Sequence, residues 1–250
     1  MVAVVVSRRR ALALLAAPVA VAAGGTAVAS WWSAAPAKKV RAEFSTSLAG
    51  RSPAQRHNAR WAARRLDGAV IAQNGSFSYN HRLGPWTRNE GVLRAPVSYG
   101  GILVPSWGGG VCQVSTTLYC AALLAGLEVI ERHPHEVAPS YIPAGMDAAV
   151  AFNLADLRLH NPFNYPVTIE CRIEADRLLC RLVAESDSSP TVHYQLVREL
   201  VSSQLPPRLE RGHPQPGRAG VRVRLWRVRP DSAERFLCNE TEYAALPRSG

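Results

Sequence analysis

Apolar residues in the middle of the chain recur with the period of a helix. Between Val114 and Ala125 they fall at the spacing of one helix face, and Gly126 follows as a C-terminal stop. Residues 53–66 mix basic and apolar positions in the pattern of a second, amphipathic helix. The polar residues His57 and Asn58 of that helix are expected to be solvated or to cap neighbouring groups.

The C-terminal half consists of short runs with the composition of strands, separated by turn residues. The last run alternates apolar and arginine side chains, which is typical of an edge strand with one basic face. These patterns predict an α+β fold with a mostly antiparallel sheet and a central helix that carries Cys112 at its N-terminus. Strands are expected over residues 149–153, 157–160, 167–173, 178–183, 191–201 and 221–228.

The first 29 residues have the pattern of an export signal. Three arginines precede an Ala/Val/Leu-rich run that ends in Ala27-Val28-Ala29, a small-residue cleavage site. The run is about 19 residues long, near the length that spans a bilayer, so an uncleaved anchor is the alternative. We therefore expect an exported protein of the cell envelope or a secreted one, by the Sec or the twin-arginine route. The expected segments are a signal peptide or anchor over 1–29, a spacer over 30–42, a domain over 43–185, and a linker with a β-rich tail over 186–250.

The charge of the chain favours anionic partners. The formal net charge is +10, and the three signal arginines account for 3 of it, which leaves +7 on residues 30–250. Such a surplus attracts anionic wall polymers or lipid head groups. Nucleic acid is not an expected partner, because the chain has neither a helix-turn-helix pattern nor zinc-ligand spacing. Contact with a membrane is expected only if the N-terminal segment stays uncleaved.

The stretch GGGVCQVSTTLY, residues 108–119, is the strongest candidate for chemistry. Three glycines allow a sharp turn and a close approach to a ligand, and Cys112 follows at the expected start of the helix. At that position the unpaired backbone N–H groups and the helix dipole stabilise a thiolate, the form of cysteine that attacks. The alternative is a tight loop with Cys112 as a small buried apolar residue.

This stretch and three other segments resemble the VanW family, named after an accessory protein of vancomycin-resistance clusters. The other segments are GSFSYN at 75–80, AGLEVIERHPH at 125–135 and YIPAGMDA at 141–148, in the family's order and spacing. The resemblance implies an extracytoplasmic role in the cell wall, with peptidoglycan as the partner. Some VanW-domain proteins are reported to be cysteine L,D-transpeptidases that cross-link peptidoglycan stems, and for many others the activity is unknown.

A thiol nucleophile needs a base and a group that orients the base. The order Cys112, His135, Asp147 resembles that of papain-like and transglutaminase-like enzymes, which suggests the same arrangement by analogy. His135 occupies the place of the family's motif histidine, and His133 is the alternative base. Asp147 could orient the histidine or cap a turn. A zinc site of Cys112, His133 and His135 lacks the usual ligand spacing, so neither a metal nor a cofactor is expected.

The remaining candidate residues surround this trio. Gly108, Gly109, Gly110 and Gln113 are expected to supply backbone N–H groups to an oxyanion, so a valine at position 110 should abolish turnover and leave the fold largely intact. Trp86, Tyr99 and Trp107 could line a groove for the substrate, with core packing as the alternative for each ring. The other expected contacts with substrate are Tyr141, Ser115 and Thr116.

The cysteine count leaves one thiol unpaired, since an exported chain with five cysteines has an odd one. If Ala175-Asp176 is a two-residue hairpin loop, Cys171 faces Cys180 in a non-hydrogen-bonded pair, with Cα atoms about 4.5 Å apart. A disulfide is expected there, and two reduced side chains packed in the sheet are the alternative.

The function expected from these features is acyl transfer on peptidoglycan stem peptides through a Cys112 thioester. The competing hypothesis is a non-catalytic wall-binding or resistance-accessory module that uses the same cleft. A peptidoglycan amidase or peptidase would use the same residues with water as the acceptor.

Overall fold

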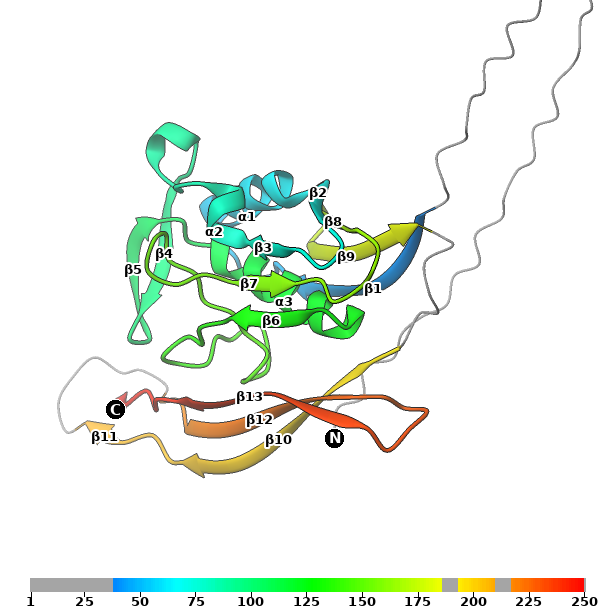
Figure 1. Ribbon diagram of the computed structural model, residues 1–250. Coiled ribbons are helices and arrows are strands. Elements are labelled where there is room, and N and C mark those ends of the chain that lie inside the picture. The colour runs from blue at the N-terminus through cyan, green and yellow to red at the C-terminus, as the bar shows by residue number, and fades with distance from the viewer. Residues whose placement is uncertain (1–37, 186–192, 210–216, 250) are drawn as a thin grey trace, which may run out of the picture. The chain divides into compact units, whose positions relative to one another are not determined.

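The computed structural model describes residues 38–185, 193–209 and 217–249 (Figure 1). The expected export segment and most of the spacer lie outside these residues. Residues 36–250 form one compact unit. Within the described part of the chain, no helix combines the length and the hydropathy that crossing a bilayer requires.

A four-stranded antiparallel sheet of order β1-β9-β8-β2 supports the helices. Its strands are β1 (Lys38–Ser47), β2 (Ala69–Ile71), β8 (Val167–Glu174) and β9 (Arg177–Glu185). Helix α3 (Val111–Ala125) packs against β1 and β9, and α1 (Pro53–Leu66) packs against β8 and α3. The main hydrophobic core lies between these helices and the sheet.

The other strands form smaller sheets. The antiparallel sheet β3-β7-β6 consists of β3 (Ser76–Ser78), β7 (Arg158–His160) and β6 (Glu128–Glu131). A hairpin of β4 (Arg94–Tyr99) and β5 (Ile102–Trp107) stands beside it (Figure 1). Two short helical elements, α2 (Tyr79–Leu83) and the 3-10 turn η1 (Arg88–Glu90), connect β3 to β4. These elements give an α+β fold dominated by antiparallel strands.

The C-terminal part is a three-stranded antiparallel sheet with an adjoining short pair. The sheet has the order β10-β12-β13, formed by β10 (Gln195–Gln204), β12 (Gly220–Val228) and β13 (Arg235–Tyr243). The strands β11 (Arg208–Leu209) and β14 (Arg248–Ser249) pair in parallel.

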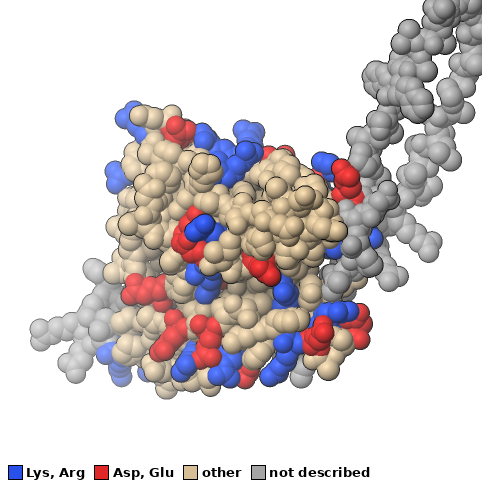
Figure 2. All heavy atoms as spheres, in the orientation of Figure 1, with Lys and Arg blue, Asp and Glu red and all other residues tan. Residues whose placement is uncertain are grey.

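Two expectations about strands are wrong. Residues 149–153 form only isolated bridges, to His133 and to Ala155, because the chain turns back at Ala151, whose amide donates to the Ala155 carbonyl oxygen at 2.9 Å. Strand β12 is the centre of its sheet rather than an edge. Two of its three arginines are paired with an acidic residue of the neighbouring strand β13: Arg222 and Arg224 both contact Glu240. Blue and red side chains are accordingly interspersed over the lower part of the molecule (Figure 2).

The helix ends follow the local sequence. Ser52 caps α1 in a capping box with Gln55, and the Ser52 side chain accepts from the Gln55 amide at 3.2 Å. Helix α3 starts after Gly110 at φ +107° and ends at Gly126 at φ +88°, both left-handed conformations that favour glycine. Every residue of α3 except Cys112 and Leu124 is buried.

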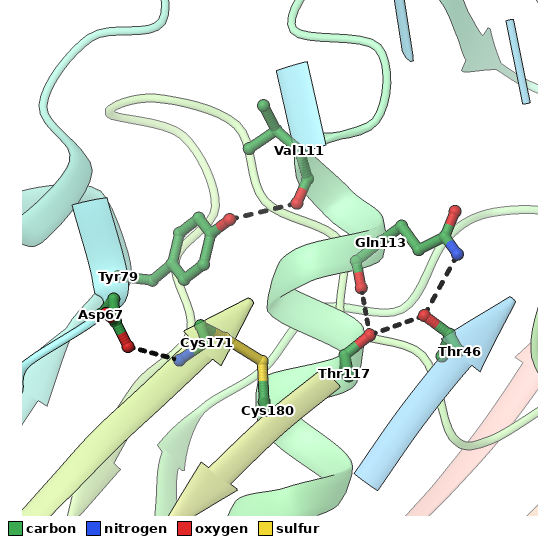
Figure 3. The surroundings of a disulfide bond; sticks show 8 residues. All are labelled: Thr46, Asp67, Tyr79, Val111, Gln113, Thr117, Cys171 and Cys180. Carbon is green, nitrogen blue, oxygen red and sulfur yellow. Dashed lines mark hydrogen bonds between the residues drawn. A yellow bond between two sulfur atoms is a disulfide. The ribbon is translucent and has the colours of Figure 1, made fainter. Parts of the chain in front are cut away.

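The hairpin of β8 and β9 has the register predicted for a two-residue loop at Ala175-Asp176. Glu174 faces Arg177 and Cys171 faces Cys180, with the two cysteine Cα atoms 4.4 Å apart and their sulfur atoms bonded. The Cys171 amide donates to Asp67 Oδ1 at 3.0 Å rather than to the partner strand, as a non-hydrogen-bonded pair requires (Figure 3). The described cysteines outside this bond are Cys112, Cys120 and Cys238, all free.

Candidate active site

The glycine loop before α3 is held by close backbone contacts. An ideal Cβ on Gly109 would lie 2.5 Å from the Pro96 carbonyl oxygen, and one on Gly110 would lie 2.3 Å from that of Gln55. The buried Asn58 side chain of α1 donates to the carbonyl oxygens of Gly109 and Leu93, at 2.9 Å each. Asn58 therefore fixes the glycine loop and Leu93 to α1. The expectation that it is solvated or merely caps a neighbour is wrong.

Cys112 is the second residue of α3 and is half-buried. Its Sγ lies 3.4 Å from the Val150 carbonyl oxygen, and His135 lines the same cleft and lowers the pKa of the thiol. At this helical position the backbone N–H has no acceptor within an α-helix. By contrast, the amides of Val111 and Gln113 donate to Gly108 and Gly110 at 2.9 and 3.2 Å. The Cys112 amide is thus, unlike those of Val111 and Gln113, available to an incoming oxyanion.

Antiparallel pairing places His135 opposite Asp147. The bridge between His133 and Ala149 sets the register, and the Ala149 amide donates to the His133 carbonyl oxygen at 2.7 Å. Two residues further along each segment, His135 Nδ1 lies 2.7 Å from Asp147 Oδ2, and the His135 amide donates to the same oxygen at 2.8 Å. With Nδ1 bound to the carboxylate, Nε2 is the ring nitrogen that faces the thiol.

Asp147 is fully buried and its charge is compensated on both oxygens. Oδ2 receives the two bonds from His135, while Oδ1 accepts from Arg132 Nη2 at 2.9 Å and from the Tyr243 hydroxyl. Burial raises the pKa of this carboxyl group, but the hydrogen bond from His135 and the charge of Arg132 lower it by more, so Asp147 is ionised.

The thiol and the imidazole shift each other's titration in opposite directions. Burial raises the pKa of Cys112, but the hydrogen bond and the charge of His135 outweigh it, and the net pKa is lowered. Burial lowers the pKa of His135, but its bonds to Asp147 and to Cys112 raise it to about 10. The charged imidazole therefore favours the thiolate form of Cys112.

The pair opens into a cleft of about 610 Å³. The cleft is walled on one side by the β4–β5 hairpin and on the other by the segment that follows His135, and its lining is a mixture of aromatic, apolar and charged side chains. The lining includes Arg51, Trp86, Trp107, Cys112, His135 and Tyr141.

The aromatic side chains expected to contact substrate line this cleft, whereas Ser115 and Thr116 do not. Trp107 is exposed on one wall, and Tyr141 lines the floor with the Arg51 guanidinium 4.7 Å from its ring centroid. Ser115 and Thr116 are fully buried. The Ser115 hydroxyl donates to the Ala148 carbonyl oxygen at 2.7 Å, so these two residues tie the segment after Asp147 to α3 and have no surface to offer a substrate.

The Gln113 side chain is occupied by the fold. Its carbonyl oxygen accepts from Arg51 Nε at 2.8 Å, and its amide nitrogen donates to the Ser47 carbonyl oxygen at 2.8 Å. Figure 3 shows that side chain directed toward Thr46 of β1. Gln113 thus positions Arg51 at the cleft and joins α3 to the sheet.

The alternative base and the zinc alternative find no support in the geometry. His133 Nε2 contacts Glu131 Oε1 at 2.9 Å. In the part of the chain that the structure describes, no three His, Cys, Asp or Glu residues are grouped so that they could hold a metal ion.

The comparisons with known proteins cover the segment that builds this site. The family model described as VanW like protein matches residues 54–183, which is 130 of the 250 residues. The chain is 38% identical over 129 residues to "Uncharacterized protein YoaR" of Bacillus subtilis, covering 52% of this chain and 41% of that protein.

A second relative is more distant. The chain is 24% identical over 144 residues to "Vancomycin B-type resistance protein VanW" of Enterococcus faecalis, covering 56% of this chain and 52% of the relative. It therefore spans about half the length of the curated relatives it matches. No solved structure matches the chain. On the extent of the family match, the chain belongs to the VanW family.

Proposed function

We propose that this protein is an exported cell-envelope enzyme that transfers acyl groups between peptidoglycan stem peptides through a thioester on Cys112. The observation that carries the proposal is the Cys112–His135–Asp147 arrangement at the edge of an open cleft. By analogy, it suggests the arrangement of papain-like and transglutaminase-like enzymes, in which a cysteine at a helix start faces a histidine.

In the first half-reaction the Cys112 thiolate attacks the carbonyl carbon of a stem peptide bond. The carbonyl oxygen takes up negative charge beside the Cys112 amide at the start of α3, where the helix dipole stabilises it. The C–N bond then breaks, His135 Nε2 gives its proton to the leaving amine, and the acyl group remains on sulfur. Asp147 holds the imidazole in place and stabilises its charged form.

In the second half-reaction an amine of another stem attacks the thioester. His135, now neutral, accepts the proton of that amine, and the C–S bond breaks to return the thiolate–imidazolium pair. Water in place of the amine would give hydrolysis by the same steps.

The cleft suits a peptide that carries carboxylates. Trp86 and Trp107 offer apolar faces along the wall, and the Arg51 guanidinium lies beside Tyr141, whose hydroxyl is 3.3 Å from the Cys112 carbonyl oxygen. Arg51 uses Nε for Gln113 and lines the cleft, which leaves its terminal nitrogens to pair with a carboxylate. Stem peptides supply both carboxylates and amines.

Three further features support a place in the cell envelope. The N-terminal residues have the pattern of an export signal. The Cys171–Cys180 disulfide is of a kind that forms and persists in oxidising compartments. One of the relatives is named as a vancomycin B-type resistance protein.

The experiment is a two-substrate assay with the purified protein, a tetrapeptide stem as donor and a second stem as acceptor. Mass spectrometry should find a cross-linked dimer and the released fourth residue, and neither should form with Cys112→Ser. A hydrolysed donor without dimer would make the protein a peptidase of the same mechanism. Binding of the donor with no product from the wild-type protein would contradict catalysis and favour a wall-binding module.

A further inference from the structure

The strand β13, which lies beyond the residues matched by the family model, sends three polar side chains toward Asp147. Asn239, Thr241 and Tyr243 are two residues apart along the strand and therefore share one face of it. Their register partners on β12 are Leu225, Val223 and Val221, of which the first two are fully buried. Polar residues on a buried face need partners, and here the partners belong to the candidate active site.

Tyr243 makes the most direct contact. Its hydroxyl donates to Asp147 Oδ1 and accepts from the Gly145 amide at 2.7 Å and from Arg132 Nη2 at 3.2 Å. Tyr243 is 2% exposed, and burial together with the charge of Asp147 raises its pKa, so the hydroxyl keeps its proton and remains a donor.

Thr241 is linked to the Asp147 carboxylate through Arg132. Its hydroxyl accepts from Arg132 Nη1 at 2.8 Å and donates to Asn239 Oδ1 at 2.8 Å. The same arginine donates through Nε to the Asp147 backbone carbonyl at 2.8 Å and through Nη2 to Oδ1. The guanidinium is thus fixed on three sides, by β13 and by both the backbone and the side chain of Asp147.

We infer that β13 is a positioning element of the thiol–imidazole pair, with Tyr243 holding the Asp147 carboxylate so that only Oδ2 is left for His135. This inference rests on the proposed function, because it assigns a role within the same site. A carboxylate with both oxygens committed cannot rotate about its Cβ–Cγ bond, so the imidazole bound to Oδ2 keeps the orientation in which Nε2 meets the thiol. Without the Tyr243 hydroxyl, Oδ1 keeps one donor side chain, Arg132, which also bonds the backbone of the same residue.

The test uses Tyr243→Phe in the full chain and follows the rate of Cys112 alkylation by iodoacetamide against pH. The reaction needs no peptidoglycan substrate, so it separates the two proposals. If the wild-type thiol titrates like an ordinary one, the proposed function loses its basis. If the wild-type thiol titrates low, the comparison between variants decides the role of β13.

Loss of the Tyr243 hydroxyl should move the alkylation midpoint upward, so that the rate at pH 6 falls about 3- to 10-fold while the rate at pH 10 stays unchanged. The matched control is Tyr119→Phe. That buried tyrosine also loses a hydroxyl bonded to β13, at 2.8 Å from Asn239 Nδ2, but does not contact Asp147 through it. Its midpoint should remain that of the wild-type protein.

A second pair keeps the test decisive if Tyr243→Phe does not fold. Thr241→Val removes the acceptor of Arg132 Nη1 at nearly constant volume, and Thr241→Ser retains it. The valine variant should show the upward shift and the serine variant should not. Unchanged midpoints in all folded variants, with only thermal stability lowered, would mean that β13 is structural and would overturn the inference.

Discussion

His135 Nδ1 and Asp147 Oδ2 lie 2.7 Å apart, on two segments whose antiparallel register is set by the bridge between His133 and Ala149. The contact commits the imidazole to one orientation and leaves Nε2 for Cys112. The pKa of His135 is raised to about 10, so the imidazole is protonated at neutral pH, and its hydrogen bond and charge lower the pKa of Cys112. This pair gives the site its predicted pH dependence.

The first prediction concerns thiol reactivity. Alkylation of Cys112 should titrate at least one unit below an ordinary thiol, whose pKa is about 8.5. In His135→Gln the midpoint should rise to or above that ordinary value, since burial of the thiol then acts without the compensating charge. The unfolded protein gives the reference profile. Coincident profiles for the folded and unfolded wild-type protein would contradict the proposed nucleophile.

The raised pKa of His135 also predicts a dependence of stability on pH. A group whose pKa is higher in the folded state stabilises that state fully below its unfolded pKa, here 6.5, and the contribution is lost as the pH rises through about 10. The difference in unfolding free energy between the wild-type protein and His135→Gln should therefore shrink over that interval. Urea titrations at pH 6 and pH 10 measure it, and a difference that grows with pH would reverse the sign we assign.

Asp147→Asn tests the buried ion pair. The change leaves the Arg132 guanidinium without its anionic partner in a site where only 7% of the arginine side chain is exposed. Breaking a buried pair on one side costs about 3–5 kcal/mol of unfolding free energy. Asp176→Asn is the control, because its pair with Arg56 is largely exposed and should matter little. Equal effects of the two changes would show that the Asp147 charge is not structurally required.

The disulfide prediction can be checked without reference to activity. Closing the loop between Cys171 and Cys180, which are nine residues apart, should stabilise the fold by about 2 to 3 kcal/mol. Urea unfolding with and without a reductant should show that loss, and the double variant Cys171→Ala, Cys180→Ala should no longer respond to reductant. Peptide mapping that joins Cys171 to Cys120 or to Cys238 would contradict the hairpin register.

Gly110→Ala should destabilise the fold rather than impair catalysis selectively. The left-handed φ of +107° and the 2.3 Å approach of a Cβ to the Gln55 carbonyl oxygen leave no room for a side chain. Gly91→Ala is the matched control, since Gly91 is also left-handed, at φ +81°, but has open space around its Cβ position. That control should cost about 1–2 kcal/mol from strain alone. A similar loss for both variants would mean that the contact with α1 is not tight. The expectation that a valine at position 110 spares the fold is therefore wrong.

The ends of α3 and the facing cysteines could be predicted from the sequence because each depends on residues close to it in the chain. The start and stop of α3 depend on Gly110 and Gly126, and the facing cysteines depend on the length of one turn. The roles of Ser115 and Thr116 could not be predicted from the sequence, since a hydroxyl near a helix start can face solvent or bond to a neighbouring segment equally well. Only the position of Ala148 decides between the two.

No local sequence pattern predicts that the C-terminal sheet contacts the candidate active site. The residues of β13 include Asn239, Glu240, Thr241 and Glu242, which break the apolar alternation of a strand. Their polar side chains are taken up by distant partners, as with Tyr243 and Asp147, which are 96 residues apart. Because the sequence does not predict β13, its pattern predicts β12 as an edge strand and the arginines of β12 as an exposed basic face. Once the antiparallel pairing of His133 with Ala149 is known, it follows that His135 lies opposite Asp147.

The most direct test of the central claim is the intact mass of the protein after incubation with a tetrapeptide stem or a carbapenem. The account predicts one covalent adduct, localised by peptide mapping to Cys112, absent from Cys112→Ser and slowed in His135→Gln. An adduct on Cys120 or Cys238 instead, or an unmodified protein under conditions in which the stem peptide binds, would contradict a nucleophilic Cys112.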